Sequence, residues 1–217
     1  MALNIGTIQP SKNTASLIAD ALRSAILQGK LQSGQSLKQD EIAAEFKVSK
    51  IPVREALVQL QAEGLVNLIP SRGATVSTLT LAEVEEIYIM RRALEPIALR
   101  RAVPLLTPAN FIHIESILDQ IDHEEDMTKW VELNGEFHAL LYAPSKMPLL
   151  IQNCRTMHNN VARYLVHYLD KDYLAESQQQ HRNIVASARS GNADAACALL
   201  ENHLGDPVQV FAEILHK

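Results

Sequence analysis

Four side chains in the second half of the chain have the types and spacing of a metal site. Asn134 and His138 are four residues apart, so they share one face of a helix. His181 and His203 fall in two later helical stretches, 22 residues apart. Three imidazoles and an oxygen donor from three helices suit a divalent cation such as zinc, with coordination positions left for water or a ligand. Chance is the competing interpretation, because the chain has eight histidines and no compact HExxH motif.

Helical patterns that can position these side chains fill the second half of the chain. Thr80 with Glu83 forms a capping box, and Thr107-Pro108 is an N-cap followed by proline at the first helical position. Further helices are predicted over "KWVELNGEFHALLYA", 148–170, 173–190, "ADAACALLENHL" and after Asp206-Pro207. We therefore expect residues 81–217 to form an all-α bundle of six or seven helices.

The first half has a different organisation. A helix ending at Gly29 is followed by the connector "LQSGQSL", the short helix "QDEIAAEFK", a tight turn and the helix that ends near Gly64. Two short strands around a Pro-Ser-Arg-Gly turn come next. This is the element order of a winged helix-turn-helix. The prediction is a mainly α fold with a winged helix-turn-helix over 1–76, a linker over 77–80 and a helical domain over 81–217.

The stretch "FKVSKIPVREALVQLQAEGLV" contains the predicted recognition helix. Pro52 near its third position is tolerated there, since the first N–H groups of a helix have no internal partner. Ser49 is placed to cap those groups. A buried stripe is expected at Val53, Ala56, Leu57 and Leu60. The opposite face then presents Lys50, Ile51, Arg54, Glu55 and Val58.

That exposed face suits the major groove of DNA. Arg54 can bond guanine or a phosphate, and Ile51 can contact a thymine methyl. The helix N-terminus itself favours a phosphate. We place Lys38, Ser49, Lys50, Ile51, Arg54, Arg72 and Gly73 in the DNA-binding surface, with Arg72 and Gly73 in the wing. The competing interpretation is that Lys50 and Arg54 form a solvated face and that Arg72 is an ordinary turn residue.

Composition narrows the class of protein. The net charge is −5, yet residues 1–76 carry eight basic and six acidic side chains, so the remainder carries −7. This asymmetry favours a polyanionic partner for the first domain. The two cysteines provide no disulfide framework and indicate a reducing compartment. With no apolar run of 18 residues and no signal segment, we expect a cytoplasmic protein without membrane contact.

The first domain resembles the DNA-binding domain of the GntR family of bacterial transcription regulators. The motifs "AILQGKLQSGQSL", "IAAEFKVSKIPVREAL", "LQAEGL" and "RGATV" match the family pattern over residues 25–76. One departure is Lys50, where arginine is usual, and lysine lacks the bidentate fork. Another is Asp40, which stands where one branch of the family has a DNA-contacting arginine.

The second domain resembles the all-helical FadR-type effector domain (FCD) of the same family. The segments "YIMRRALEPIALRRAV", "LNGEFHALLY", "QQHRNIVASARSGNADAA" and "ENHL" carry the likeness. It implies a metal held by Asn134, His138, His181 and His203 at the floor of a pocket, often coordinated by a carboxylate effector. Many relatives have aspartate where this chain has Asn134. Arg91 is expected to clamp the effector, or alternatively to pair with Glu95 on the helix surface.

Together these features predict a ligand-responsive transcription regulator, not an enzyme. It would bind pseudo-palindromic operator DNA as a homodimer and sense a small organic acid. One alternative is a metal-dependent hydrolase that uses the His138/His181/His203 cluster, and another is a nucleoid-binding protein without an effector. The remaining histidines, His113, His123, His158, His167 and His216, are interpreted as structural or surface groups.

Overall fold

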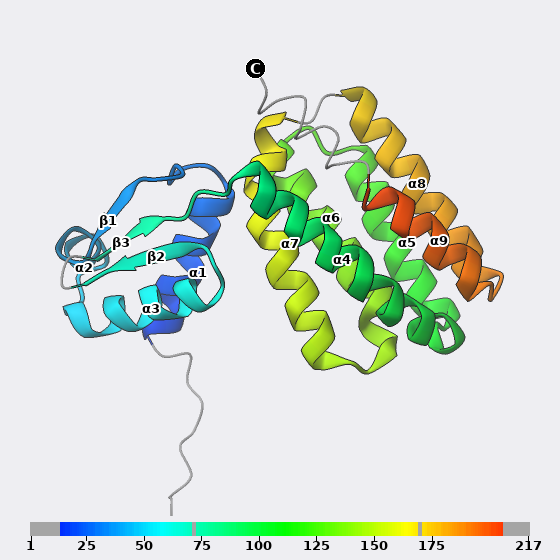
Figure 1. Ribbon diagram of the computed structural model, residues 1–217, viewed down its shortest axis with the longest axis horizontal. Helices are drawn as coiled ribbons and strands as arrows, with labels where there is room; N and C mark the ends of the chain where they lie inside the picture. Colours follow the sequence, from blue (N-terminus) through cyan, green and yellow to red (C-terminus); the bar gives the residue numbers. More distant parts are fainter. Residues whose placement is uncertain (1–13, 71–72, 169–170, 206–217) are drawn as a thin grey trace, which may run out of the picture. The chain divides into compact units, whose positions relative to one another are not determined.

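The computed structural model describes residues 14–70, 73–168 and 171–205. The chain divides into two compact units, Met1–Thr78 and Leu79–Lys217, and each is described by itself (Figure 1). The described residues of the first unit form three helices and a small sheet. The helices are α1 (Thr14–Leu27), α2 (Gln39–Phe46) and α3 (Lys50–Ala62), and the strands are β1 (Ser36–Lys38), β2 (Val66–Ile69) and β3 (Gly73–Val76).

The sheet corrects one prediction. The stretch "LQSGQSL" is not only a connector, because Ser36–Lys38 forms β1, which pairs antiparallel with β3 in the strand order β1-β3-β2. Three residues are too few to show a strand-like alternation, so only pairing with the distant β3 segment reveals the strand. Gly73 makes the pairing possible. Its φ is 128°, and a Cβ there would lie 2.1 Å from the Leu37 carbonyl oxygen.

The core of the first unit forms between α1, α3 and the sheet. The predicted stripe of α3 is confirmed, since Val53, Ala56, Leu57 and Leu60 are all buried. A fork of two hydrogen bonds, each 2.6 Å, joins the Arg23 guanidinium of α1 to the Glu63 carboxylate after α3. Planar bidentate pairs of this kind fix orientation as well as adding energy. The fork therefore holds α1 against the end of the recognition helix.

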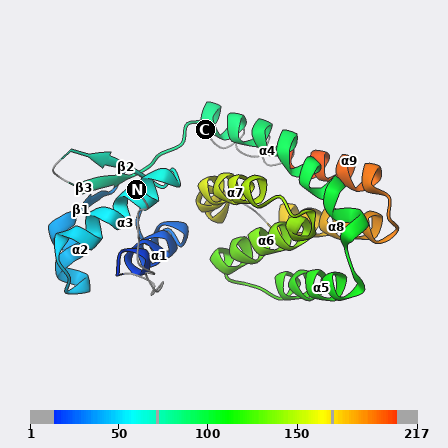
Figure 2. The same ribbon diagram turned by 90° about the horizontal axis from the view of Figure 1, so that it is seen from below.

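The second unit is helical throughout its described residues, as predicted (Figure 2). Both expected capping devices are present: Thr80 and Glu83 form a capping box, and so do Thr107 and Asn110, ahead of Pro108. The predicted last helix, after Asp206, lies outside the described residues. The helices are α4 (Leu81–Ala102), α5 (Pro108–Asp122), α6 (Met127–Tyr142), α7 (Pro148–Tyr168), α8 (Lys171–Arg189) and α9 (Ala193–His203).

The packing of the bundle brings distant segments together. α6 packs against α4, α5 and α7, and α9 packs against α4 and α8. Short 3-10 turns, Val103–Leu105 and Ala143–Ser145, follow α4 and α6. Among the described residues, no helix is both long and apolar enough to cross a lipid bilayer. The interior between α4, α6, α8 and α9 is where the predicted metal ligands must meet.

Candidate metal centre and nucleic-acid interface

Three of the four predicted metal ligands converge inside the second unit. His138 of α6, His181 of α8 and His203 of α9 are buried, and each offers a ring nitrogen within 4.8 Å of those of the other two. The Nε2 atoms of His181 and His203 are 3.2 Å apart. Asn134 lies one turn before His138 and is buried too, and its Oδ1 makes no hydrogen bond. A buried, unsatisfied amide oxygen beside three imidazoles fits the donor set of a cation site.

The proton of His138 is fixed by a chain of hydrogen bonds from α4. The Tyr142 hydroxyl donates to the Glu95 carboxylate at 2.6 Å, so its oxygen can only accept from His138 Nδ1, 3.1 Å away. His138 therefore carries its proton on Nδ1. Its Nε2 has a free lone pair and no hydrogen-bond partner. Orienting partners of this kind are typical around metal-bound histidines.

The other two histidines are held in the same tautomer. Gln178 donates its amide N–H groups to the Leu118 carbonyl and to Asp122, which leaves its oxygen to accept from His181 Nδ1 at 2.8 Å. The Gln180 oxygen lies 2.8 Å from His203 Nδ1 and accepts from it. With both protons on Nδ1, the contact between the two Nε2 atoms joins two lone pairs. Such a contact is unfavourable unless a cation lies between them.

The donor set fits a zinc-like ion in its geometry and in its protonation. The Nε2 separation of 3.2 Å agrees with the roughly 3.3 Å between nitrogens of a tetrahedral site with Zn–N bonds of about 2.05 Å. The imidazoles are neutral, as metal ligation requires. Burial lowers the pKa of His203 to about 3, and burial with the neighbouring histidines lowers the pKa values of His138 and His181 well below their usual range.

Arg91 pairs with Glu95 one turn along α4, at 2.6 Å between Nε and Oε1. The sequence offered this pairing as the alternative to effector binding, but placed it on the helix surface. The pair is in fact buried, because α4 is covered on this side by α6, α7 and α9. The guanidinium also lies 5.2 Å from the centre of the Tyr88 ring. Arg91 thus places positive charge beside the histidine cluster and pairs with the Glu95 carboxylate, which accepts the hydrogen bond from Tyr142.

His158 of α7 is a further polar group in this interior, which the sequence did not mark as part of the site. Its ring centre is 6.2 Å from that of His138, and it is buried. The Val131 carbonyl lies near enough to favour a protonated ring, yet neither nitrogen makes a hydrogen bond of good geometry, and burial lowers its pKa to about 3. Gly135 is the residue in the sequence that could have indicated a close neighbour here, because glycine is unusual in the middle of a helix. A Cβ at Gly135 would lie 2.8 Å from His158 Nε2.

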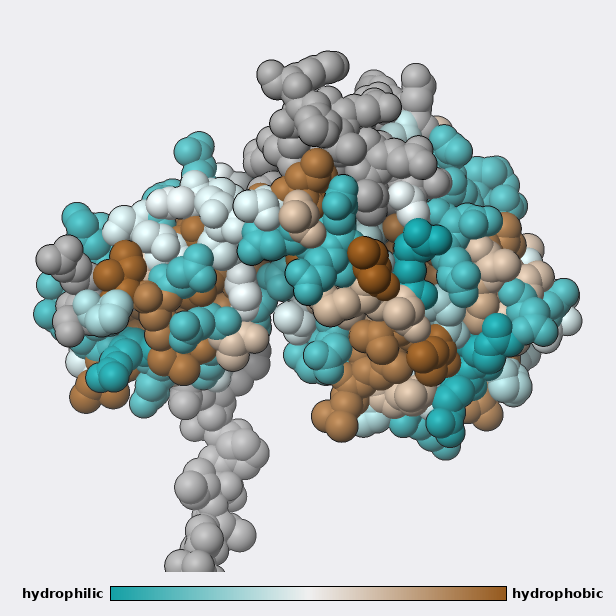
Figure 3. Space-filling model, viewed as in Figure 1, coloured by the Kyte–Doolittle hydropathy of each residue, from teal (hydrophilic) through white to brown (hydrophobic). Residues whose placement is uncertain are grey.

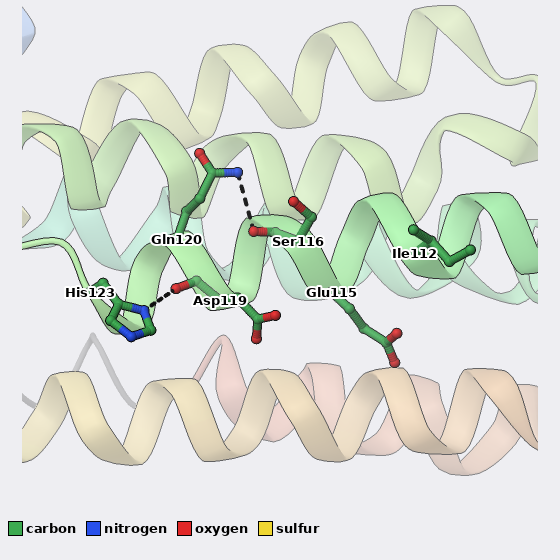
Figure 4. A pocket seen from close by; sticks show the side chains of 6 residues that line it. All are labelled: Ile112, Glu115, Ser116, Asp119, Gln120 and His123. Atoms are coloured by element: carbon green, nitrogen blue, oxygen red, sulfur yellow. Dashed lines mark hydrogen bonds between the residues drawn. The ribbon is translucent and has the colours of Figure 1, made fainter.

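A hollow on the outer face of α5 is separate from this cluster (Figure 4). Its lining residues, including Ile112, Asp119 and His123, all belong to α5 or the residue after it, and none is a predicted site residue. His123 there bonds the Asp119 carbonyl through Nδ1, at 2.7 Å. The facing arginines of α8 are already engaged, since Arg182 pairs with Asp119 and Asp122, and Arg189 pairs with Glu115. The hollow offers no concentration of free charge to an anion.

The recognition helix presents the face that the sequence predicted. Ile51 has 70% of its surface exposed, and Lys50, Arg54, Glu55 and Val58 are exposed beside it. Arg54 makes no ion pair with any described residue. Lys50 does, because its ammonium lies 2.5 Å from the carboxylate of Asp40 at the start of α2. The two departures from the family pattern are therefore in contact with each other, which neutralises part of the positive charge of this face.

The other predicted DNA contacts have varied surroundings. Ser49 occupies the N-cap position of α3, but its side chain makes no capping hydrogen bond, so that prediction was wrong and the first N–H groups of α3 remain available. Lys38 bonds Glu41 at 2.7 Å, and this partner raises its pKa. Gly73 has the structural role in β3 described above. Arg72 lies outside the described residues.

The two units thus define a winged helix-turn-helix joined to an all-helical domain with a buried histidine cluster. Residues 14–76 match the bacterial regulatory proteins of the gntR family, and residues 86–206 match the FCD domain. The chain belongs to the GntR family of transcription regulators, in the branch with an FCD domain. The family consists of regulators, which excludes the alternative of a metal-dependent hydrolase.

Individual relatives agree with this assignment. The chain is 27% identical over 203 residues to the HTH-type transcriptional repressor RspR of Escherichia coli K12, covering 91% of this chain and 88% of that protein. It is 24% identical to the repressor GlaR of the same organism, over 89% and 94%. A GntR regulator from Rhodococcus sp. RHA1 has a similar structure, with a TM-score of 0.78, 26% identity and 91% and 97% coverage. Escherichia coli McbR/YncC shares the fold, with a TM-score of 0.83, 21% identity and 94% and 100% coverage.

Proposed function

We propose that this transcription regulator is ligand-responsive and senses a small organic acid at a metal-containing pocket of its FCD domain. The observation that carries the proposal is the convergence of three histidine Nε2 lone pairs, with the opposite ring nitrogens held as donors by Tyr142, Gln178 and Gln180. His138, His181 and His203 would hold the ion, and Asn134 Oδ1 is the fourth donor. The ion, when bound, would supply a Lewis-acidic anchor for an oxygen ligand.

The charge balance of the pocket favours an anionic effector. All four donors are uncharged, so a divalent cation held by them keeps its full positive charge inside a buried site. Glu95, whose carboxylate lies 3.9 Å from His138 Nδ1, is already paired with Arg91. A carboxylate that binds the open coordination positions would compensate the remaining charge. Arg91 adds a favourable field for the same anion, and its engagement with Glu95 makes direct contact a secondary role.

The DNA-binding part of the proposal rests on the exposed N-terminal turns of α3. A homodimer would place two such helices in successive major grooves of a pseudo-palindromic operator, with half-sites about one helical turn apart. Arg54, which pairs with no carboxylate of the described residues, is the strongest candidate for base contact. Arg54→Ala should weaken binding to operator DNA more than binding to non-specific DNA. Equal losses on both would make Arg54 a phosphate contact instead. Coupling of about 1–3 kcal/mol between effector and operator suffices to switch occupancy.

Thermal unfolding in the presence of small organic acids tests the effector pocket. The experiment is run with and without a chelator, after metal content has been measured by elemental analysis. An acid that raises the melting temperature only when metal is present supports the proposal, because a ligand of the native state raises apparent stability. An acid effect that survives chelation would move the anchor to Arg91. The absence of any response to metal, chelator or acid would contradict the proposed pocket.

A matched pair of variants controls for non-specific metal uptake. His181→Gln removes one of the converging Nε2 atoms, whereas His113→Gln removes an exposed imidazole of α5. Zinc titration followed by calorimetry should show binding to the wild type and to His113→Gln, with strong loss for His181→Gln. Equal binding by both variants would show that the metal occupies another place on the protein.

A further inference from the structure

The outer face of α4 carries apolar side chains that the described residues of its own domain leave uncovered. Ile89 has 67% and Ile97 has 47% of their surfaces exposed, with exposed Ala93 between them. The opposite face of the same helix is buried, through residues such as Tyr88 and Leu99. A helix that is apolar on two faces is normally covered on both. Figure 3 shows apolar surface gathered on the side of this domain that faces the viewer.

The positions of the apolar and charged residues on the exposed face of α4 are symmetric about Ala93. The stripe passes through Glu86, Ile89, Ala93, Ile97 and Arg100, with spacings of three, four, four and three residues. Isoleucines stand four residues on either side of the centre. Glu86 stands seven residues before Ala93, and Arg100 stands seven residues after it. Glu85 and Arg101 form a second such pair, each eight residues from Ala93. A stripe that is symmetric in its apolar residues and opposite in its charges is complementary to itself when the direction is reversed.

We infer that α4 packs antiparallel against α4 of a second copy of this chain, with the two-fold axis passing at Ala93. Each Ile89 then packs near the partner copy's equivalent of Ile97, and each Glu86 meets the equivalent of Arg100. The small alanine at the centre allows close approach of the two helices. The inference gives a location to the homodimer in the proposed function, on which it rests. Self-complementary surfaces related by a two-fold axis are the commonest basis of protein dimers.

The surroundings of the stripe are compatible with a second α4 helix packed against it. A groove of about 580 Å³ follows the stripe between α4 and Glu201 of α9. Arg100 now pairs with Asp194 of α9, an exposed pair that is worth little and can be shared or exchanged. Acidic residues near the start of a helix and basic ones near its end also favour the helix dipole, which accounts for the charges alone. The dipole does not account for the exposed isoleucines.

Another exposed apolar position on this domain lacks these properties. Ile112 of α5 is 69% exposed and borders the hollow of Figure 4. The neighbouring residues along α5 include Glu115 and Asp119 but no lysine or arginine of the same helix, so this face lacks the complementary charge pattern of α4. Ile112 therefore provides a matched control for α4.

Cysteine cross-linking tests the position of the axis. A residue on a two-fold axis lies opposite its own copy, so Ala93→Cys should form a covalent dimer under mild oxidation, within the roughly 4.4–6.8 Å that disulfides require between Cα atoms. Ile112→Cys should not. The native Cys154 and Cys197 are buried and provide the background level in the wild type. Failure of Ala93→Cys to cross-link in a protein that sediments as a dimer would overturn the inference while leaving the homodimer itself intact.

Charge exchange tests the pairing. Glu86→Arg and Arg100→Glu, each alone, should raise the dimer dissociation constant at least roughly tenfold in sedimentation equilibrium, because like charges meet at both ends. An equimolar mixture of the two variants should recover dimers, since the mixed dimer joins opposite charges at both ends: Arg at position 86 meets Glu at position 100, and Arg100 meets Glu86. Glu132→Arg, an exposed residue of α6, should have no effect. Melting temperatures of the variants distinguish dissociation from unfolding.

The remaining outcomes are also decisive. Single variants that dimerise like the wild type, or a mixture that fails to recover dimers, would contradict the pairing of Glu86 with Arg100. A wild type that is monomeric at all concentrations tested would remove the homodimer from the proposed function. A monomeric protein in which the thiol introduced by Ala93→Cys also resists thiol reagents would show that another segment of the same chain covers α4.

Discussion

The recognition helix and the histidine cluster differ in their exposure and in the number of elements that build them. The face of α3 consists of consecutive turns of one helix, exposed to solvent, and its residues, from Lys50 to Val58, stand close together in sequence. The cluster is buried and draws its histidines from α6, α8 and α9, with orienting partners from α4, α6 and α8. A surface that reads DNA needs only one rigid element. A buried polar site depends on hydrogen bonds from several elements, which must all be in place at once.

A fall in pH should give the largest difference in stability between the two units. All eight histidines lie beyond residue 78, and burial lowers the pKa values of His158 and His203 to about 3. The unfolded chain then binds protons that the folded domain cannot, so stability of the second unit falls as pH drops below about 6.5 and continues to fall towards about pH 3. Each of these histidines contributes up to about 1.4 kcal/mol per pH unit.

The measurement is thermal unfolding of the chelated protein from neutral to mildly acidic pH, followed by hydrogen exchange of each unit. The first unit, which has no histidine, should change much less over this range. Equal loss of protection in both units would contradict the assignment of the pH dependence to the buried imidazoles.

Substitution of Gly73 should destabilise the first unit as strongly as loss of a cluster residue destabilises the second. Gly73→Ala puts a methyl group 2.1 Å from a backbone oxygen at a φ of 128°, so it should destabilise the winged domain by roughly 3 kcal/mol or more and abolish operator binding. Gly191→Ala is the control: its φ is also positive, but nothing lies near the added group, and the expected loss is about 1 kcal/mol. Denaturant titration measures the free energy of unfolding of both variants. Equal losses would show that the positive φ, and not the close contact with the backbone oxygen, determines the cost.

Tyr142→Phe sharpens the account of the cluster. The variant keeps the ring but removes the hydroxyl that fixes the proton of His138 on Nδ1 and places its Nε2 lone pair at the centre. Zinc affinity should fall about 10–100-fold, as is usual for loss of an orienting partner. Tyr88→Phe changes a tyrosine that contacts Arg91 rather than His138, and it should reduce the affinity much less. A calorimetric titration that shows equal affinities for wild type and Tyr142→Phe would refute the assigned tautomer.

Asp40→Asn should have the smallest effect, and in the opposite direction. The change frees Lys50 and removes one negative charge from the DNA-facing surface, so affinity for non-specific DNA should rise a few-fold, with a steeper dependence on salt. Glu55→Gln removes a charge from the same helix without freeing Lys50, and it separates the two contributions. Fluorescence anisotropy at several salt concentrations provides the comparison. Unchanged or weaker binding by Asp40→Asn would show that Lys50 does not contact DNA.

The sequence was most informative where function depends on local pattern. The buried stripe of α3, the two N-terminal capping devices and the order of helices could all be predicted, because helical periodicity and N-terminal capping act over three or four residues. The same reasoning failed at Ser49, whose type suits a cap but whose side chain makes no such bond. It also failed at β1, which exists only because β3 pairs with it.

By itself, the sequence determined the family, the two kinds of domain and the residue types of both sites. Only the tertiary structure decided that the three histidines meet with their Nε2 atoms inward, that Tyr142 and Gln178 fix their protons, and that His158 joins the same interior. It also decided that Arg91 is buried against Glu95 and that Lys50 meets Asp40. The physical reason is range: helix formation depends on neighbours in sequence, whereas burial, protonation and ion pairing depend on groups that are distant along the chain.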